Sequence, residues 1–186
     1  MTVRIVTDST ADLPADIIRD LNITVVPAYV NIQGHSYQDG VDISADEVYR
    51  RLVESDHPIT TSQPSPADFA ATYQRVLKEA DEIVSIQATS KLSGIYRSAQ
   101  QAREQVQGKG RIEVVDSSSV SIGLGLITIA AARRAKSGVG ISDVLDETAK
   151  AIEQLHIWAF FDTLKYVFRG GRLGKAIDVE QQDAEL

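Results

Sequence analysis

The sequence contains no cysteine, one methionine, one tryptophan and only three histidines among 186 residues. The absence of cysteine excludes a disulfide framework, thiolate chemistry and a cysteine-ligated zinc site. His35, His57 and His156 are scattered and form no His-x-x-x-His pair, so boundary positions explain them better than catalysis. The chain also lacks a Gly-x-Ser-x-Gly elbow, a Walker motif and a three-glycine dinucleotide fingerprint. Common catalytic classes therefore lack their sequence signature here.

An excess of basic residues and a long apolar run are also missing. Nineteen Lys and Arg against 26 Asp and Glu give a net charge of −7, which argues against a nucleic-acid-binding face and a polybasic membrane anchor. The most apolar stretch, 122–132, is too short to span a bilayer, and residues 1–4 do not open a signal peptide. We therefore expect a cytoplasmic protein with no nucleic-acid partner and no membrane span.

What is present is a regular alternation of β-rich runs with helical patterns. Strands are expected at 3–7, 23–32, 82–86 and 111–115, and helices at 10–21, 44–54, 65–80, 93–106, 121–136 and 142–155. This alternation predicts an α/β fold, with a parallel sheet flanked by helices on both faces. Ligands of such sheets bind outside the carboxyl ends of the strands.

Local signals mark several helix starts and one close packing site. Ser65 precedes Pro66 in the pattern of a cap followed by the first helical residue, and Ser44 and Ser142 are interpreted as plain helix caps. Gly123 and Gly125 fall early in an apolar helix, where glycine more often permits close packing than ligand binding.

The end of the chain has a different character. Residues 157–161 are aromatic and predict a strand, and 163–174 read as a short helix that runs into a glycine-rich basic turn. From 178 on the sequence is acidic and has no pattern, so we expect that something is missing after Lys175. An uncovered aromatic segment favours self-association.

Two hydroxyl-rich segments, 60–66 and 91–96, are interpreted as turns that precede helices. Hydroxyls and free amides at a helix start bind carboxylate or phosphate, although a single Ser or Thr there is more commonly only a cap. The candidate ligand-binding residues in these turns are Thr61, Ser62, Ser93 and Gly94.

Acids and hydroxyls also follow two strands, at 8–10 and 116–119. Turn and cap chemistry, with hydrogen bonds across the sheet edge, is a better interpretation than a metal site, because carboxylates are too sparse. We expect no metal and no cofactor. Arg169 and Arg172 flank a double glycine, and two interpretations stay open: compensation of a helix dipole, and close approach to a ligand.

Taken together, these segments resemble the DegV family of bacterial proteins. The resemblance rests on six motifs in the family's order, namely 7–14 (Thr-Asp-Ser-Thr-Ala-Asp-Leu-Pro), 61–65 (Thr-Ser-Gln-Pro-Ser), 90–94 (Ser-Lys-Leu-Ser-Gly), 115–117 (Val-Asp-Ser), 123–125 (Gly-Leu-Gly) and 170–174 (Gly-Gly-Arg-Leu-Gly). The resemblance implies a two-lobed lipid-binding protein that holds a long-chain fatty acid, such as palmitate, without catalysis. It implies that Thr61 and Ser93 bind the carboxylate and that Arg172 lies near it. Some members present the fatty acid to a partner kinase, which phosphorylates it.

The sequence departs from the family pattern in two places. The family often has threonine after the Ser-Gly pair, where this chain has Ile95, and its members continue well beyond the Gly-Gly-Arg turn. We therefore expect one α/β lobe over 1–154 and an incomplete start of a second α/β lobe over 155–186. The rival function is a small hydrolase or transferase for acyl or phosphorylated substrates, and it requires an activated base beside Ser93 or Ser118.

Overall fold

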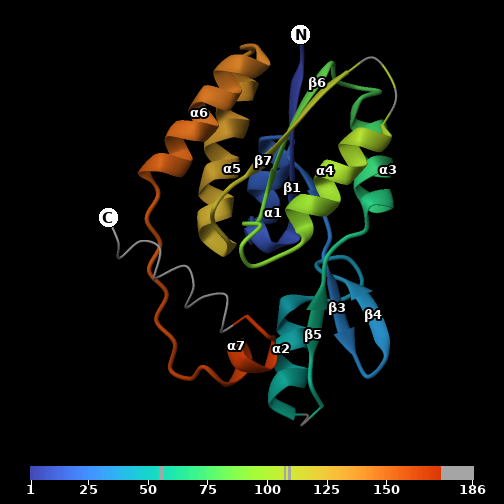
Figure 1. The fold of residues 1–186 in the computed structure, drawn as a ribbon, viewed down its shortest axis with the longest axis vertical. Helices are drawn as coiled ribbons and strands as arrows, with labels where there is room; N and C mark the ends of the chain where they lie inside the picture. Colours follow the sequence, from blue (N-terminus) through green and yellow to red (C-terminus); the bar gives the residue numbers. More distant parts are fainter. Residues whose placement is uncertain (55–56, 107, 109, 173–186) are drawn as a thin grey trace. The chain divides into compact units, whose positions relative to one another are not determined.

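The structure is a computed structural model that describes residues 1–54, 57–106, 108 and 110–172. It divides into two compact units (Figure 1). The α/β unit comprises Met1–Pro27 and Gln63–Ile157, and the small unit comprises Ala28–Ser62 with the described part of Trp158–Leu186. The predicted boundary after residue 154 separates two lobes of a longer fold, which is a different division from these compact units, and it stays a prediction.

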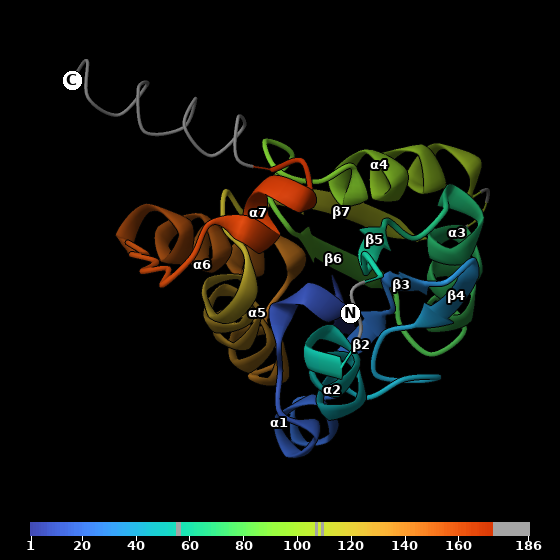
Figure 2. The same ribbon diagram turned by 90° about the horizontal axis from the view of Figure 1, so that it is seen from below.

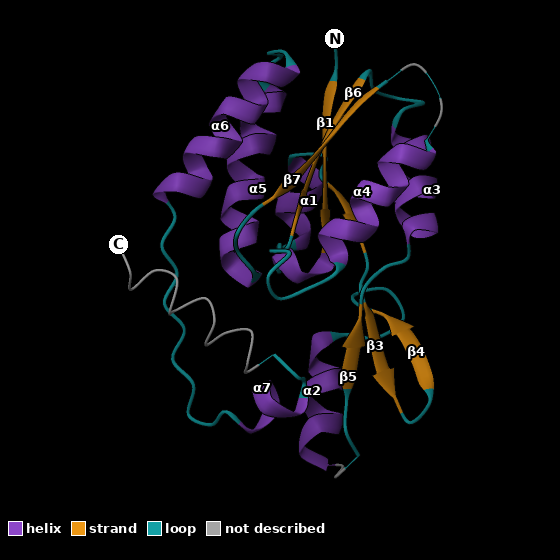
Figure 3. Cartoon of the chain, in the orientation of Figure 1, coloured by secondary structure: helices purple, strands orange, loops and turns teal. Residues whose placement is uncertain are grey.

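A four-stranded parallel sheet forms the centre of the α/β unit (Figure 3). Its strand order is β2-β1-β6-β7. The strands are β1 (Val3–Asp8), β2 (Thr24–Val26), β6 (Glu82–Gln87) and β7 (Arg111–Asp116). Their β-branched residues are largely buried, as expected for strands covered on both faces. The parallel sheet predicted from the sequence is therefore confirmed.

Helices cover both faces of this sheet, with α5 and α6 on one face and α3 and α4 on the other (Figure 2). The helical elements of the unit are η1 (Ser9–Ala11), α1 (Ala15–Asp20), α3 (Pro66–Val76), α4 (Ile95–Gln105), α5 (Ser121–Lys136) and α6 (Ile141–Gln154). Phe69 and Tyr73 of α3, Ile83 of β6 and Leu124 of α5 are fully buried in the resulting core.

The packing role predicted for the glycines of α5 is confirmed. A Cβ at Gly125 would lie 2.5 Å from the carbonyl oxygen of Ala11, and one at Gly123 would lie 1.9 Å from Cδ1 of Ile157. The absence of a side chain lets α5 approach the turn after β1. This turn lies at the carboxyl edge of the sheet, so the close packing also fixes the edge.

The small unit contains an antiparallel sheet of order β4-β3-β5 and one longer helix. Its elements are β3 (Tyr29–Ile32), β4 (His35–Gln38), α2 (Ala45–Glu54), β5 (Thr60–Ser62) and α7 (Lys165–Arg169). Gln33 and Gly34 both have positive φ (49° and 81°), as the tight turn of a hairpin requires. Val30, Ile32 and Ile43 form a small buried core of their own.

Two secondary-structure predictions fail, one at 23–32 and one at 60–62. The run 23–32 is not one strand, because Pro27 interrupts it: β2 joins the parallel sheet and β3 joins the antiparallel sheet. The segment 60–62, predicted as a turn, is the edge strand β5. Thr60 and Thr61 are β-branched, and this property favours a strand over the predicted turn.

Three further predictions need correction. Residues 157–161 form no strand, and no described residue pairs with them, so their β-propensity finds no ladder. The first helix begins at Ala15 rather than near Thr10, because Asp12 is left-handed (φ 49°). Ser142 lies inside α6, whose cap is Gly140, so Ser142 is not a cap. The cap at Ser65 is confirmed, with Pro66 as the first helical residue.

The tail predicted from 178 on lies outside the described residues. Within the residues that are described, no helix combines the length and the apolar character needed to cross a membrane.

Candidate functional site

The loop 88–94, between β6 and α4, lies at the carboxyl edge of the parallel sheet. Each backbone amide from 88 to 93 donates a hydrogen bond within the α/β unit. The amides of Leu92 and Ser93 both donate to the carbonyl oxygen of Thr89 (3.2 and 3.1 Å). The loop is therefore held in one conformation by the residues around it, and this conformation sets the position of Ser93.

Ser93 and Gly94 supply hydrogen-bond donors at the start of α4. Oγ of the half-buried Ser93 accepts from the amide of Ile95 (3.3 Å), so Ser93 does support the helix start. The hydroxyl hydrogen of Ser93 and the amide of Gly94 have no acceptor in the described part of the chain. Both lie where the partial positive charge of a helix is concentrated, which favours an anion.

Gln63 contacts the start of α4 within the α/β unit. Its Nε2 donates to Oγ of Ser98 (3.0 Å), and a Cβ at Gly94 would lie only 1.8 Å from its Oε1. Glycine at 94 therefore leaves room for the Gln63 amide. Gln63 was not among the predicted site residues, although its place between Ser62 and Pro64 in the motif was a usable signal.

Thr61 and Ser62 belong to β5 in the small unit. Thr61 is exposed and pairs with Val30 of β3, and its hydroxyl has no partner among the residues described. Oγ of Ser62 accepts from Nδ2 of Asn31 (3.1 Å), so this hydroxyl also supports the antiparallel sheet. Both hydroxyls therefore keep a donor hydrogen that has no acceptor among the described residues, and the Ser62 hydroxyl is also used as an acceptor.

Arg172 folds back on the end of α7. Its Nη1 donates to the carbonyl oxygen of Gly170 (2.6 Å), and its amide donates to that of Val167 (3.2 Å). Gly171 is left-handed (φ 71°), a conformation that favours glycine. The guanidinium thus compensates carbonyl groups at a helix end, one of the two roles considered for it.

The turn chemistry predicted after β1 and β7 is confirmed. Oδ1 of Asp8 accepts from the amide of Thr10, and Oδ1 of Asp116 accepts from the amide of Ser118, both at 3.0 Å. Asp8 is fully buried, and this burial raises the pKa of its carboxyl above the usual value, against the opposing effect of its hydrogen bonds. In the described part of the chain, no cluster of acids and histidines could hold a metal ion.

The residues around the hydroxyls do not form an activated nucleophile. Neither a histidine nor a carboxylate is bonded to the Ser93 hydroxyl among the residues described. The contact of Ser118 with Asp116 is made by its backbone amide. A serine nucleophile needs a base within hydrogen-bond reach, and the described residues place none on the Ser93 hydroxyl.

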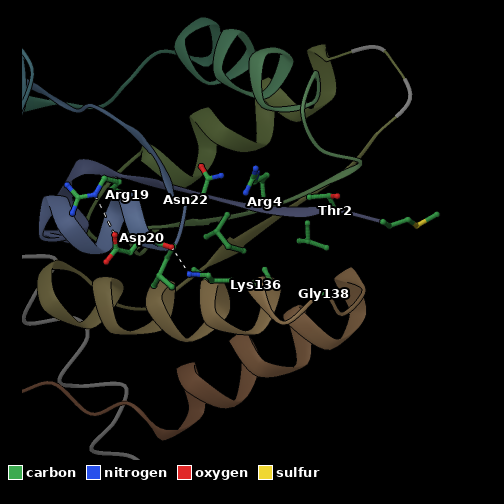
Figure 4. Close-up of a pocket in the computed structure, with 13 residues that line it drawn as sticks. Thr2, Arg4, Arg19, Asp20, Asn22, Lys136 and Gly138 are labelled. Atoms are coloured by element: carbon green, nitrogen blue, oxygen red, sulfur yellow. Dashed lines mark hydrogen bonds and ion pairs between the residues drawn. The ribbon is translucent and has the colours of Figure 1, made fainter.

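A pocket of about 480 Å³ lies at the opposite end of β1, between the ends of α1 and α5 (Figure 4). Its basic side chains are already engaged: Arg19 pairs with Asp20 (3.5 Å), Lys136 donates to the Asp20 carbonyl oxygen (2.9 Å), and Arg4 donates to the side-chain oxygen of Asn22 (2.7 Å) when that amide is turned to satisfy both of its ends. Figure 4 shows Arg4 and Asn22 on one side of β1 and Lys136 on the other. The basic groups therefore do not converge on one ligand.

Comparison with known sequences places the chain beside one family. The DegV family, described as uncharacterised proteins, matches residues 2–179. A DegV domain-containing protein of Caldanaerobacter subterraneus is 42% identical over 93% of this chain and 61% of its own length. One from Deinococcus radiodurans is 37% identical over 95% of this chain and 62% of its own length. The chain thus spans about three-fifths of these relatives.

Solved structures of the same fold include fatty-acid-binding proteins. A DegV family protein from Thermus thermophilus, described by its fatty acid binding, has a TM-score of 0.81 and 37% identity, over 93% of this chain and 61% of that one. A stearic-acid-binding protein from Eubacterium ventriosum has a TM-score of 0.84 and 29% identity, over 95% and 61%. DegV from Bacillus subtilis, a fatty acid binding protein, has a TM-score of 0.89 and 27% identity, over 97% and 64%.

Proposed function

We propose that this chain, which belongs to the DegV family, binds the carboxylate of a long-chain fatty acid and does not catalyse a reaction on it. The observation that carries the proposal is a pair of donors at the start of α4, the Ser93 hydroxyl and the Gly94 amide, for which the described residues provide no acceptor. Thr61, Ser62 and Arg172 complete the proposed ligand-binding set. The fatty acids bound by similar solved proteins support the choice of ligand.

The energetics assign different roles to the two ends of the ligand. Burying about fifteen methylene groups at roughly 0.8 kcal/mol each contributes on the order of 12 kcal/mol, of which binding entropy offsets a large part. A hydrogen bond to a charged group adds only about 1.5–3 kcal/mol. We therefore assign the affinity mainly to the hydrocarbon tail, and the orientation of the ligand to the hydroxyls.

Native mass spectrometry of the protein purified from cells tests the proposal. We expect a bound species with the mass of a fatty acid, and binding of added palmitate after delipidation. A protein that is empty after purification and does not bind palmitate contradicts the proposal for this chain. A screen with ester and phosphate substrates tests the rival function, and we expect no turnover.

We also propose that the bound fatty acid is presented to a kinase in the cytoplasm. The support is the accessible position of the donors at a helix start, since phosphorylation requires that the carboxylate be reached from outside. In a reaction with a bacterial fatty acid kinase, we expect this protein to support formation of acyl phosphate from palmitate. Absence of product, with palmitate bound, contradicts the presentation role and leaves the binding role intact.

We further propose that the chain self-associates through its aromatic segment. Trp158 and Phe160 are 84% and 94% exposed, and Phe168 is 70% exposed. Exposed apolar side chains of this size favour association. Sedimentation velocity should show a concentration-dependent oligomer that is lost in Trp158→Ser/Phe160→Ser. Val53→Ser, at another highly exposed apolar side chain, is the control and should leave the oligomer unchanged.

A further inference from the structure

Each of the two strands that flank β6 ends at an aspartate that is followed by a serine. β1 ends at Asp8 and is followed by Ser9, and β7 ends at Asp116 and is followed by Ser117. In the sheet order β2-β1-β6-β7, these two ends lie on either side of the end of β6. The loop 88–94 leaves from the end of β6, so one aspartate stands on each side of it.

On the β1 side, Asp8 uses its two carboxylate oxygens differently. Oδ1 accepts from the amide of Thr10, two residues further along its own turn (3.0 Å). Oδ2 accepts from the amide of Ala88, the first residue of the loop (2.9 Å).

On the β7 side, Asp116 repeats this arrangement. Oδ1 accepts from the amide of Ser118, two residues further along its own turn (3.0 Å), and Oδ2 accepts from the loop amide of Ser90 (3.1 Å). Between the two aspartates, the amide of Thr89 donates to the carbonyl oxygen of Ser119 (2.9 Å). Three consecutive amides at the base of the loop are therefore held from both sides.

These contacts reach Ser93 through Thr89. The carbonyl oxygen of Thr89 accepts from the Ser93 amide (3.1 Å), so the position of Thr89 determines that of Ser93. A loop that is already ordered loses less conformational entropy when a ligand binds. The hydrogen bond from Oδ2 of each aspartate to a loop amide would therefore order the loop in the absence of ligand.

We propose that Asp8 and Asp116 are a pair of positioning residues that fix the Ser93 loop in its ligand-binding conformation. As far as the ligand is concerned, this inference rests on the proposed function. The simpler alternative is that each aspartate only stabilises its own turn. That role needs Oδ1 alone and does not explain why both Oδ2 atoms bond to amides of the same neighbouring loop.

Replacement by asparagine separates the two roles. Asparagine keeps one side-chain oxygen, which suits the local turn, and it replaces the other with an amide nitrogen that cannot accept from a loop amide. Asp8→Asn and Asp116→Asn should therefore keep their turns and release the loop. Tyr73→Phe is the matched control, because it removes a buried hydrogen bond to Ser85 (2.7 Å) in the same unit without touching the loop.

Hydrogen exchange of the backbone amides at 88–93 and palmitate affinity are the two measurements, made at a temperature where every variant is folded. We expect both asparagine variants to exchange about tenfold faster in this segment and to bind palmitate about tenfold more weakly, as for one lost hydrogen bond to a charged group. Tyr73→Phe should lower the melting temperature and change neither quantity.

Unchanged exchange at 88–93 in the asparagine variants overturns the proposal, as does an affinity loss no larger than that of Tyr73→Phe. If the wild-type protein does not bind palmitate, the proposed function fails, and the exchange data alone decide whether the loop is fixed by the aspartates. If Asp8→Asn does not fold, the half-buried Asp116 decides the question.

Discussion

The loop that carries Ser93 and the strand that carries Thr61 present their hydroxyl groups in opposite ways. The loop 88–94 follows β6, one of the two inner strands of the parallel sheet, and all its amides from 88 to 93 are hydrogen-bonded. β5 is a three-residue edge strand whose residues are all exposed and which, among the described strands, pairs with β3 alone. The backbone that carries the Ser93 hydroxyl is therefore fixed by hydrogen bonds, whereas the Thr61 hydroxyl lies on the edge strand of a small sheet.

This difference indicates that the two hydroxyls contribute differently to ligand binding in the proposed site. A donor in a fixed loop points in a defined direction at no further entropic cost, so it is suited to orienting the carboxylate. A donor on a short edge strand adjusts more easily to the ligand, because edge strands have few tertiary constraints. Ser93 should therefore contribute more to head-group binding than Thr61.

The largest effect should come from Ser93→Ala. It removes the fixed donor, and palmitate affinity should fall about ten- to a hundredfold, as expected for a hydrogen bond to a charged group. The melting temperature should change little, because the one bond that Oγ of Ser93 makes within the described part of the chain, to the Ile95 amide, is long (3.3 Å). Isothermal titration calorimetry and thermal unfolding of the same sample measure the two quantities. A large loss of stability with unchanged affinity shows that Ser93 is only a cap.

Thr61→Val should have a smaller effect on the same affinity. Valine keeps the shape of threonine and its strand propensity but lacks the hydroxyl, so we expect a loss of up to about tenfold. Calorimetry with palmitate provides the measurement. A loss larger than that of Ser93→Ala reverses the proposed order of the two donors.

Gly94→Ala should break the hydrogen bond between Gln63 and Ser98. The φ of Gly94 is −85°, so alanine fits the backbone, but its methyl group displaces the Gln63 amide from Ser98. We expect a loss of about 1 kcal/mol in the free energy of unfolding. In a Gln63→Ala background the same substitution should cost clearly less, because the bond is already absent. An equal loss of stability in the two backgrounds contradicts a role of Gly94 in making room for the Gln63 side chain.

The smallest effects separate a true helix cap from an apparent one. Ser65→Ala should lower the free energy of unfolding by about 1 kcal/mol, because Oγ of Ser65 accepts from the Asp68 amide in a capping box. Ser142→Ala should change it by less than about 0.5 kcal/mol, because Ser142 lies inside α6 and is exposed. Chemical denaturation measures both, and neither variant should alter palmitate affinity.

The sequence predicted best those elements whose signals are local. The start of α3 is encoded by Ser65, Pro66 and Asp68, which lie within four residues of one another. The small unit was not predicted, since an apolar run such as 23–32 looks the same in a parallel and in an antiparallel sheet. Only Pro27 signalled that the run divides. The strand predicted at 157–161 depended on a partner that no described residue provides.

The candidate site was predicted in part for the same reason. The hydroxyls of Thr61 and Ser93 and the aspartates after two strands are recognisable from residue type and position. The contacts of Gln63 with Gly94 and Ser98 cross more than thirty residues of sequence, and no local pattern encodes them. Whether Thr61 and Ser93 act on one ligand remains a prediction.

The most direct test of the central claim compares palmitate with hexadecanol, which has the same chain length but no carboxylate, in wild type and Ser93→Ala. We expect the wild type to prefer palmitate by about ten- to a hundredfold and Ser93→Ala to reduce this preference by about tenfold. A wild-type protein that binds both ligands equally well, or a preference that Ser93→Ala leaves intact, contradicts the assignment of Ser93 to the carboxylate.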